Sequence, residues 1–181
     1  MAKHLRQPNG PDAGTPFKPT REQARFILWL YAIDSTGRWA YSRAVYRRLK
    51  GSGKGPLGAA LCLFELLGAC RFDGWNKDGT PRTRSIPDAL VHIGAVRQDQ
   101  AVDTVLRYVK LMVGDRDEID GHAIVVGAER VLAGKNSIRK IEVVTTAMEG
   151  LEGKPSTFAL VDEPHHLTSS NGGTGLVEVL K

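Results

Sequence analysis

A basic, glycine-rich loop between two apolar runs constrains this chain more than any other feature. Its residues, 46–56, read Tyr-Arg-Arg-Leu-Lys-Gly-Ser-Gly-Lys-Gly-Pro; an aromatic run predicted to be a strand (39–47) leads into it, and an Ala/Leu-rich run predicted to be a helix (57–67) follows. Glycines at such a junction let backbone N–H groups converge on an anion, and the helix N-terminus adds its positive end. The loop therefore predicts a phosphate site, with a plain strand–loop–helix connection as the alternative.

The loop matches the phosphate-loop template G-x-x-x-x-G-K-[ST] in part. Gly53 and Lys54 agree with it, whereas Arg48 stands at the first glycine and Gly55 at the hydroxyl residue. Lys54 is placed to reach the outer phosphates of a nucleotide. The other nucleotide-binding positions expected in the loop are Gly51 and Ser52, together with Gly53 and Gly55.

Charge and composition narrow the class of protein. The chain carries a net charge of +5, and basic residues crowd the predicted strand and loop with no acid between them: Arg38, Arg43, Arg47, Arg48, Lys50 and Lys54. Such a cluster suits polyphosphate and, less specifically, nucleic acid, although a solvated basic edge is the alternative. No run is apolar enough to cross a bilayer and no secretory signal precedes the domain, so we expect no membrane partner and a cytoplasmic location. Both cysteines are expected to be buried and reduced.

Periodicity and turn residues predict the other elements. Thr20 is the expected N-cap of a helix over 21–33, whose Gln23 is either a surface residue or an amide placed to read an adenine edge. The further elements expected are a flexible arm (1–19), a loop (70–87), a buried parallel strand (89–96) with a hydrogen-bonded core histidine at His92, a helix (97–112), a hairpin of two strands (124–132 and 138–146), a loop (147–156) and a short helical run (176–180).

A second informative stretch ends in two acids. Thr157 to Glu163 reads Thr-Phe-Ala-Leu-Val-Asp-Glu, a short apolar strand followed by carboxylates. Ligands of open α/β sheets bind at the carboxyl edge of the strands. Asp162 is expected to hold Mg²⁺, and Glu163 to orient or deprotonate a water. His165 and His166 are either metal ligands with Asp162 or residues that shape the turn or sense the γ-phosphate side.

Taken together, these motifs resemble the large terminase, the ATPase subunit of the motor that packages DNA into phage heads, and most closely that of phages of actinobacteria. The resemblance covers Pro16 to the last residue and rests on four motifs in order: Thr20-Arg-Glu-Gln23, the basic loop, Phe72-Asp-Gly-Trp75, and Thr157-Phe-Ala-Leu-Val-Asp-Glu-Pro-His-His166. It implies an α/β fold with a parallel sheet of the RecA-like P-loop NTPase type, including a small β-hairpin insertion. Residues 20–181 would be a partial ATPase domain without the nuclease domain.

The resemblance also implies roles. Gln23 would belong to an adenine-binding motif, Gly53 and Lys54 would hold the phosphates of ATP, and Lys50 would stand where relatives carry an arginine that contacts the nucleotide. Asp162 would organise Mg²⁺ and Glu163 would be the catalytic carboxylate. The implied partners are double-stranded DNA, further large-terminase copies in a ring, the portal protein and the small terminase, in the host cytoplasm.

Departures from the family pattern leave other functions open. Gly55 lacks the hydroxyl that normally ligates Mg²⁺, and Lys50 lacks the forked geometry of arginine. The main alternative is therefore a nucleotide- or nucleic-acid-binding module without effective catalysis. Another P-loop enzyme, such as a helicase core, is the third possibility.

Overall fold

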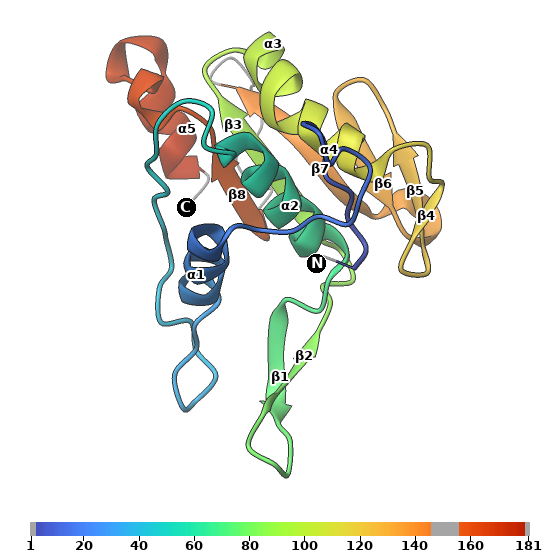
Figure 1. Ribbon diagram of the computed structural model, residues 1–181. Coiled ribbons are helices and arrows are strands. Elements are labelled where there is room, and N and C mark those ends of the chain that lie inside the picture. Colours follow the sequence, from blue (N-terminus) through green and yellow to red (C-terminus); the bar gives the residue numbers. More distant parts are fainter. Residues whose placement is uncertain (1–2, 146–155, 180–181) are drawn as a thin grey trace.

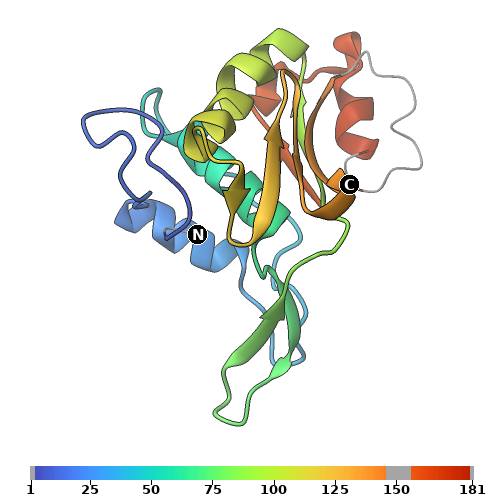
Figure 2. The ribbon, with the colours of Figure 1, turned by 90° about the vertical axis from the view of Figure 1, so that its right-hand side faces the viewer.

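The computed structural model describes residues 3–145 and 156–179 as a mixed sheet with helices on both faces (Figures 1 and 2). The sheet has six strands in the order β4-β5-β6-β7-β3-β8: β4 (Glu118–Ile119), β5 (His122–Val126), β6 (Arg130–Ala133), β7 (Arg139–Thr145), β3 (Leu90–Ala95) and β8 (Phe158–Val161). The helices are α1 (Arg21–Leu30), α2 (Lys54–Leu67), α3 (Gln98–Ala101), α4 (Arg107–Val113) and α5 (Gly173–Val179).

The sheet is parallel only in part, which corrects the expectation of a parallel sheet. β3 pairs in parallel with both β7 and β8, with Ile93 opposite Val143 and Leu160. β4, β5, β6 and β7 pair antiparallel in sequence. Short turns join these four strands, and such turns allow only antiparallel pairing. The run expected to be one strand over 124–132 contains parts of two strands, β5 and β6. The expected hairpin turn at 134–137, which joins β6 to β7, is confirmed.

The core lies between the sheet and the layer formed by α2, α3 and α4. Its buried members include Leu63, Leu66, Ile93, Met112 and Ile141. β3 is buried along nearly its whole length, as predicted for a central parallel strand. The helix expected over 97–112 is present, but a π-helical turn (Val102–Leu106) joins α3 to α4. The helix α5 lies on the opposite face of the sheet (Figure 2). There Leu176 packs against Val144.

The expected strand over 39–47 is not formed. Only Trp39 makes an isolated bridge, to Ile33, and the chain from there to the loop has no strand assignment. Aromatic contacts hold this segment against α1 rather than in the sheet: Tyr41 packs on Trp29 and Tyr46 on Phe26. Without a neighbouring strand, the backbone of this segment has no ladder to join.

Two further expectations are wrong. The loop predicted over 70–87 is a β-hairpin of β1 (Arg71–Trp75) and β2 (Pro81–Arg84) that projects from the domain (Figure 1). Turn residues at its tip predict a loop, but the residues on either side of the tip pair as antiparallel strands. The segment expected to be a flexible arm is packed instead: Leu5 and Phe17 are buried in the core, and the Phe17 N–H donates to the Leu5 carbonyl. The loop expected over 147–156 falls almost wholly outside the described residues.

Candidate functional site

The glycine loop forms a compact turn at the start of α2. Gly53 is the N-cap residue, with φ +79°, a left-handed conformation that glycine adopts without strain. Lys54, the first residue of α2, folds its side chain back so that Nζ donates to the carbonyls of Arg48 (3.1 Å) and Leu49 (3.2 Å). The ammonium group therefore lies within the loop that precedes the helix. The helix begins three residues earlier than expected.

Gln23 of α1 makes a hydrogen bond to this loop. Thr20 caps α1 as predicted, its hydroxyl accepting from the Gln23 N–H, while the Gln23 side chain accepts from the Thr20 N–H. The Gln23 amide nitrogen also donates to the Gly53 carbonyl (3.3 Å). Gln23 is 5 % exposed, so the reading of it as a surface residue is wrong. A Cβ at Gly53 would lie 2.9 Å from the Gln23 amide nitrogen, so the two residues restrict each other.

Tyr108 explains why glycine stands at the hydroxyl position of the loop. A Cβ built on Gly55 would lie 2.6 Å from Cε2 and 2.8 Å from Cδ2 of the Tyr108 ring on α4. Real Cβ atoms do not approach a ring this closely. Serine or threonine at 55 would therefore require the ring to move. No sequence signal links these two residues, because α4 is 52 positions away from the loop and meets α2 only in the fold.

The direction of α2 brings the loop to the carboxyl edge of the parallel strands. Near its start, Gly58 lies against Leu160, close to the end of β8. Near its end, the Leu66 carbonyl accepts from Arg139, the first residue of β7. The helix thus runs antiparallel to β3, β7 and β8, and its N-terminus faces the edge where these strands end (Figure 1).

Asp162 and Glu163 follow β8 at this same edge. The Asp162 N–H donates to the Gly94 carbonyl (3.1 Å), which extends the pairing of β8 with β3 by one residue. Glu163 has φ +49° and ψ +56°, a left-handed conformation that is uncommon outside glycine and is found at strained functional positions. Its carboxylate lies 3.4 Å from Nδ1 of His165.

The predicted site residues are thus brought together in two groups at one edge. Gly51, Ser52, Gly53, Lys54 and Gly55 form the loop with Gln23 behind it, and Asp162 and Glu163 form the second group. Lys50 is exposed on the loop. The hydrogen bonds described for Lys54 lead to its own loop, not to either acid.

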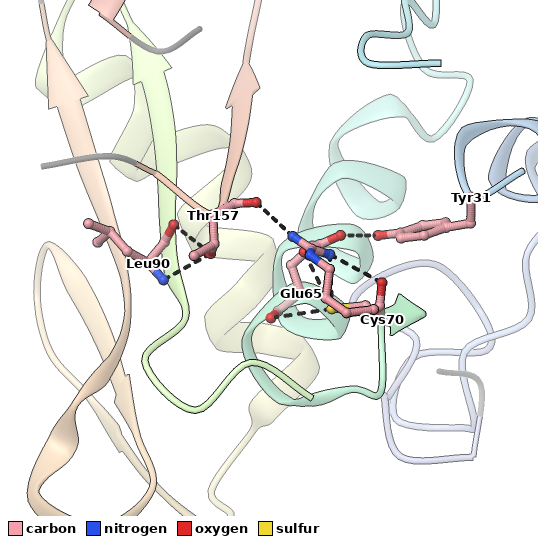
Figure 3. Close-up of polar contacts among 6 residues, drawn as sticks. Tyr31, Glu65, Cys70, Leu90 and Thr157 are labelled. Carbon is pink, nitrogen blue, oxygen red and sulfur yellow. Dashed lines mark hydrogen bonds and ion pairs between the residues drawn. The ribbon is translucent and has the colours of Figure 1, made fainter. Parts of the chain in front are cut away.

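A buried polar network that was not predicted joins Tyr31, directly after α1, to α2, to β1 and to Thr157, directly before β8 (Figure 3). Glu65 on α2 is 2 % exposed; its carboxylate accepts from the Tyr31 hydroxyl (2.7 Å) and pairs with Arg71 (2.9 Å). Arg71 also donates to the Thr157 carbonyl (2.8 Å), and the Thr157 hydroxyl bonds to the backbone of Leu90. The sequence does contain a signal for this network, because Glu65 is the single acid in the Ala/Leu-rich helix α2.

The buried network raises the pKa values of two of its members, Cys70 and Tyr31. Burial, and then the charge of Glu65, raise the pKa of the Cys70 thiol to about 12. Burial, and then the same charge, raise the pKa of the Tyr31 hydroxyl above its ordinary value. Both groups stay protonated at neutral pH and serve as donors to the carboxylate. Cys62 and Cys70 are buried free thiols, as expected.

Comparison with known proteins connects the chain to phage proteins. It is 35 % identical over 147 residues to the Gene 13 protein of Mycobacterium phage L5, and 34 % identical over 147 residues to the Gene 13 protein of Mycobacterium phage D29. Each match covers 81 % of this chain but 24 % of the relative, so the chain spans about a quarter of these proteins. No family model and no solved structure matches it.

The similarity to mycobacteriophage proteins confirms the phage part of the resemblance. The names of these relatives state no activity, so the assignment to terminases remains a prediction. Within the described part of the chain, no helix has the length and apolar character needed to cross a membrane.

Proposed function

We propose that this chain is the nucleotide-binding part of a phage large terminase, a P-loop ATPase that uses ATP and Mg²⁺ to move double-stranded DNA into the capsid. One observation carries the proposal: the glycine loop at the start of α2 and the Asp162–Glu163 pair after β8 lie at the same edge of the parallel strands. Phosphate oxygens and a divalent cation need these two kinds of group side by side.

The loop residues would bind the triphosphate. On binding, the Lys54 ammonium would exchange the Arg48 and Leu49 carbonyls for phosphate oxygens, and the N–H groups at the start of α2 would point at the same anion. The half-buried carboxylates of Asp162 and Glu163 are the hard oxygen donors that Mg²⁺ prefers. Gly55 supplies no side-chain hydroxyl, so the metal would rely on Asp162, phosphate and water. Glu163 would orient the attacking water.

Gln23 would act as a positioning residue in this scheme. Its amide is already engaged by Thr20 and by the Gly53 carbonyl. Binding of a nucleotide at the loop would therefore affect α1 through the hydrogen bond between Gln23 and Gly53. Further copies of the chain in a ring, the portal protein and the small terminase would belong to the complete motor. The exposed basic residues before the loop suit the DNA backbone.

The alternative is a nucleotide-binding module without effective catalysis. The contact of Tyr108 with Gly55 favours it, because the ring occupies the space that the Cβ of a hydroxyl-bearing residue at this position would need. Magnesium dependence separates the two functions. A catalytic site binds ATP–Mg²⁺ more tightly than metal-free ATP, whereas a basic anion site binds both alike or favours the metal-free, more negative form.

The test is equilibrium binding of a non-hydrolysable ATP analogue, with and without Mg²⁺. Lys54→Ala should weaken binding about tenfold or more, because it removes a charge-assisted hydrogen bond to phosphate. Lys77→Ala, at the exposed tip of the hairpin, is the matched control and should leave affinity unchanged. Equal affinities for wild type and Lys54→Ala would remove the loop from its role. In the full-length protein, Glu163→Gln should retain binding and stop hydrolysis.

A further inference from the structure

The turn that follows β8 carries three metal-ligating side chains in one cluster. Donor atoms of Glu163, His165 and His166 all lie within 4.8 Å of one another. The proposed nucleotide site uses the carboxylate but neither imidazole. Both histidines are exposed, so their rings are open to ions from solution.

The backbone of this turn is well defined by hydrogen bonds. Pro164–His166 forms a 3₁₀ turn in which the His166 N–H donates to the Glu163 carbonyl (3.0 Å). The amide of Asn171 donates to the His166 carbonyl (2.7 Å), while its oxygen accepts from the Thr168 N–H. Leu167, the next residue, packs with the Val144–Leu176 cluster on the sheet. The three ligands are therefore held on an anchored segment.

The spacing of the donors fits a tetrahedral ion. Zinc bonds to nitrogen or oxygen of about 2.0–2.1 Å place neighbouring tetrahedral donors about 3.3–3.4 Å apart. Glu163 Oε2 and His165 Nδ1 are 3.4 Å apart. The ring centroids of His165 and His166 lie 4.1 Å apart, and a nitrogen of His166 lies within 4.8 Å of the other two donor atoms.

The ligand types select a class of ion. Two imidazoles with one carboxylate suit Zn²⁺ and its neighbours Co²⁺, Ni²⁺ and Cu²⁺ better than Mg²⁺, which prefers oxygen ligands only. Three protein ligands leave a fourth position for water or a ligand oxygen. We propose that Glu163, His165 and His166 bind a zinc-class transition-metal ion.

This site has a consequence for the nucleotide site. Because it shares Glu163, an ion bound there would withdraw the carboxylate from water activation and inhibit hydrolysis. This consequence rests on the proposed ATPase function, whereas the metal site itself does not. Metal binding without any nucleotide binding would thus support the site and overturn the ATPase proposal.

The experiment is a Co²⁺ titration of the untagged chain, followed by the visible absorption of the bound ion and reversed by Zn²⁺. We expect one ion per chain with the intense spectrum of tetrahedral cobalt. His165→Asn, His166→Asn and Glu163→Gln should each weaken Co²⁺ binding about tenfold or more, because affinity depends on ligand number and charge. Circular dichroism of each variant checks that the fold is retained.

His4→Asn is the matched control. His4 is a partly exposed histidine beside a carboxylate, with Nδ1 3.7 Å from Asp120, but it has no second imidazole in that pair. This variant should bind Co²⁺ like the wild type. Unchanged affinity in folded His165→Asn and His166→Asn, or loss of binding in His4→Asn, would overturn the proposal.

Discussion

Arg71→Met should destabilise the domain far more than any exposed arginine substitution. The change removes the counter-charge of Glu65, whose side chain is 2 % exposed, and breaks the bonds to Glu65 and Thr157 (Figure 3). Breaking a buried ion pair from one side typically costs about 3–5 kcal/mol, because the remaining charge is desolvated and unpaired. In a domain of this size we expect the melting temperature to fall by roughly 6–20 °C.

The assay is urea unfolding followed by tryptophan fluorescence. Trp39 is a suitable probe because its ring lies 5.7 Å from the Arg71 guanidinium. Arg82→Met is the matched control: Arg82 pairs with Asp73 at 3.1 Å, but its side chain is 60 % exposed, so the free energy of unfolding should change by about 1 kcal/mol or less. Both variants must retain the wild-type denaturant slope for the comparison to hold.

Adding Glu65→Gln to Arg71→Met separates the charge from the packing. The double variant has no buried carboxylate, so part of the lost stability should return, and the coupling between the two changes measures the ion pair. Two outcomes would contradict this reasoning: Arg71→Met costs no more stability than Arg82→Met, or the double variant is less stable than the sum of the single changes predicts. Either would mean that the ion pair of Glu65 and Arg71 does not stabilise the fold.

Three more predictions test the packing and the ionisation described above. Gly55→Ser should lower the melting temperature because of the Tyr108 ring, and Tyr108→Leu in the same chain should recover it; a stable single variant would contradict the contact. A thiol reagent at pH 8 should label Cys70 only after unfolding, since its pKa is raised to about 12 and its side chain is buried; rapid labelling of the native protein would contradict this. Burial opposes ionisation of Glu142, but hydrogen bonds from Lys140 and His92 outweigh it and lower the pKa of Glu142 in the folded state below 4.5. The stabilisation of the fold by ionised Glu142 is therefore present above pH 4.5 and lost as the pH falls through the folded-state pKa. Glu142→Gln should cost more stability at pH 7 than at pH 3. An equal cost at both pH values would refute the pairing.

The sequence predicted best where a pattern is local. The N-cap at Thr20, the buried strand β3 and the apolar strand that ends before Asp162 all follow from residue type and spacing, whereas the second half of the capping box, at Gln23, was not predicted. Hydrophobic periodicity and cap chemistry act over a few residues, so they need no knowledge of distant contacts. His92 was also correctly expected to be a hydrogen-bonded core residue: it is 1 % exposed and lies 3.2 Å from Glu142.

The errors arose where a local pattern depends on a distant partner. The aromatic run before the loop has strand-like composition, but a strand needs a neighbour, and Tyr41 and Tyr46 contact α1 instead. The turn residues around Gly79 read as a loop, yet they form the tip of the hairpin of β1 and β2. Pro- and Gly-rich composition made the first residues read as a free arm, although Phe17 is 2 % exposed.

Sequence alone determined which residues form the glycine loop and that two acids end a strand, because both are contiguous motifs. Only the tertiary structure decided that they share an edge, since this depends on α2 running antiparallel to β8. It also decided that Tyr108 restricts position 55, that Gln23 holds the loop, and that Arg71 neutralises Glu65. These contacts join residues far apart in the chain, and their energies exist only when packing brings the groups within a few ångströms of each other.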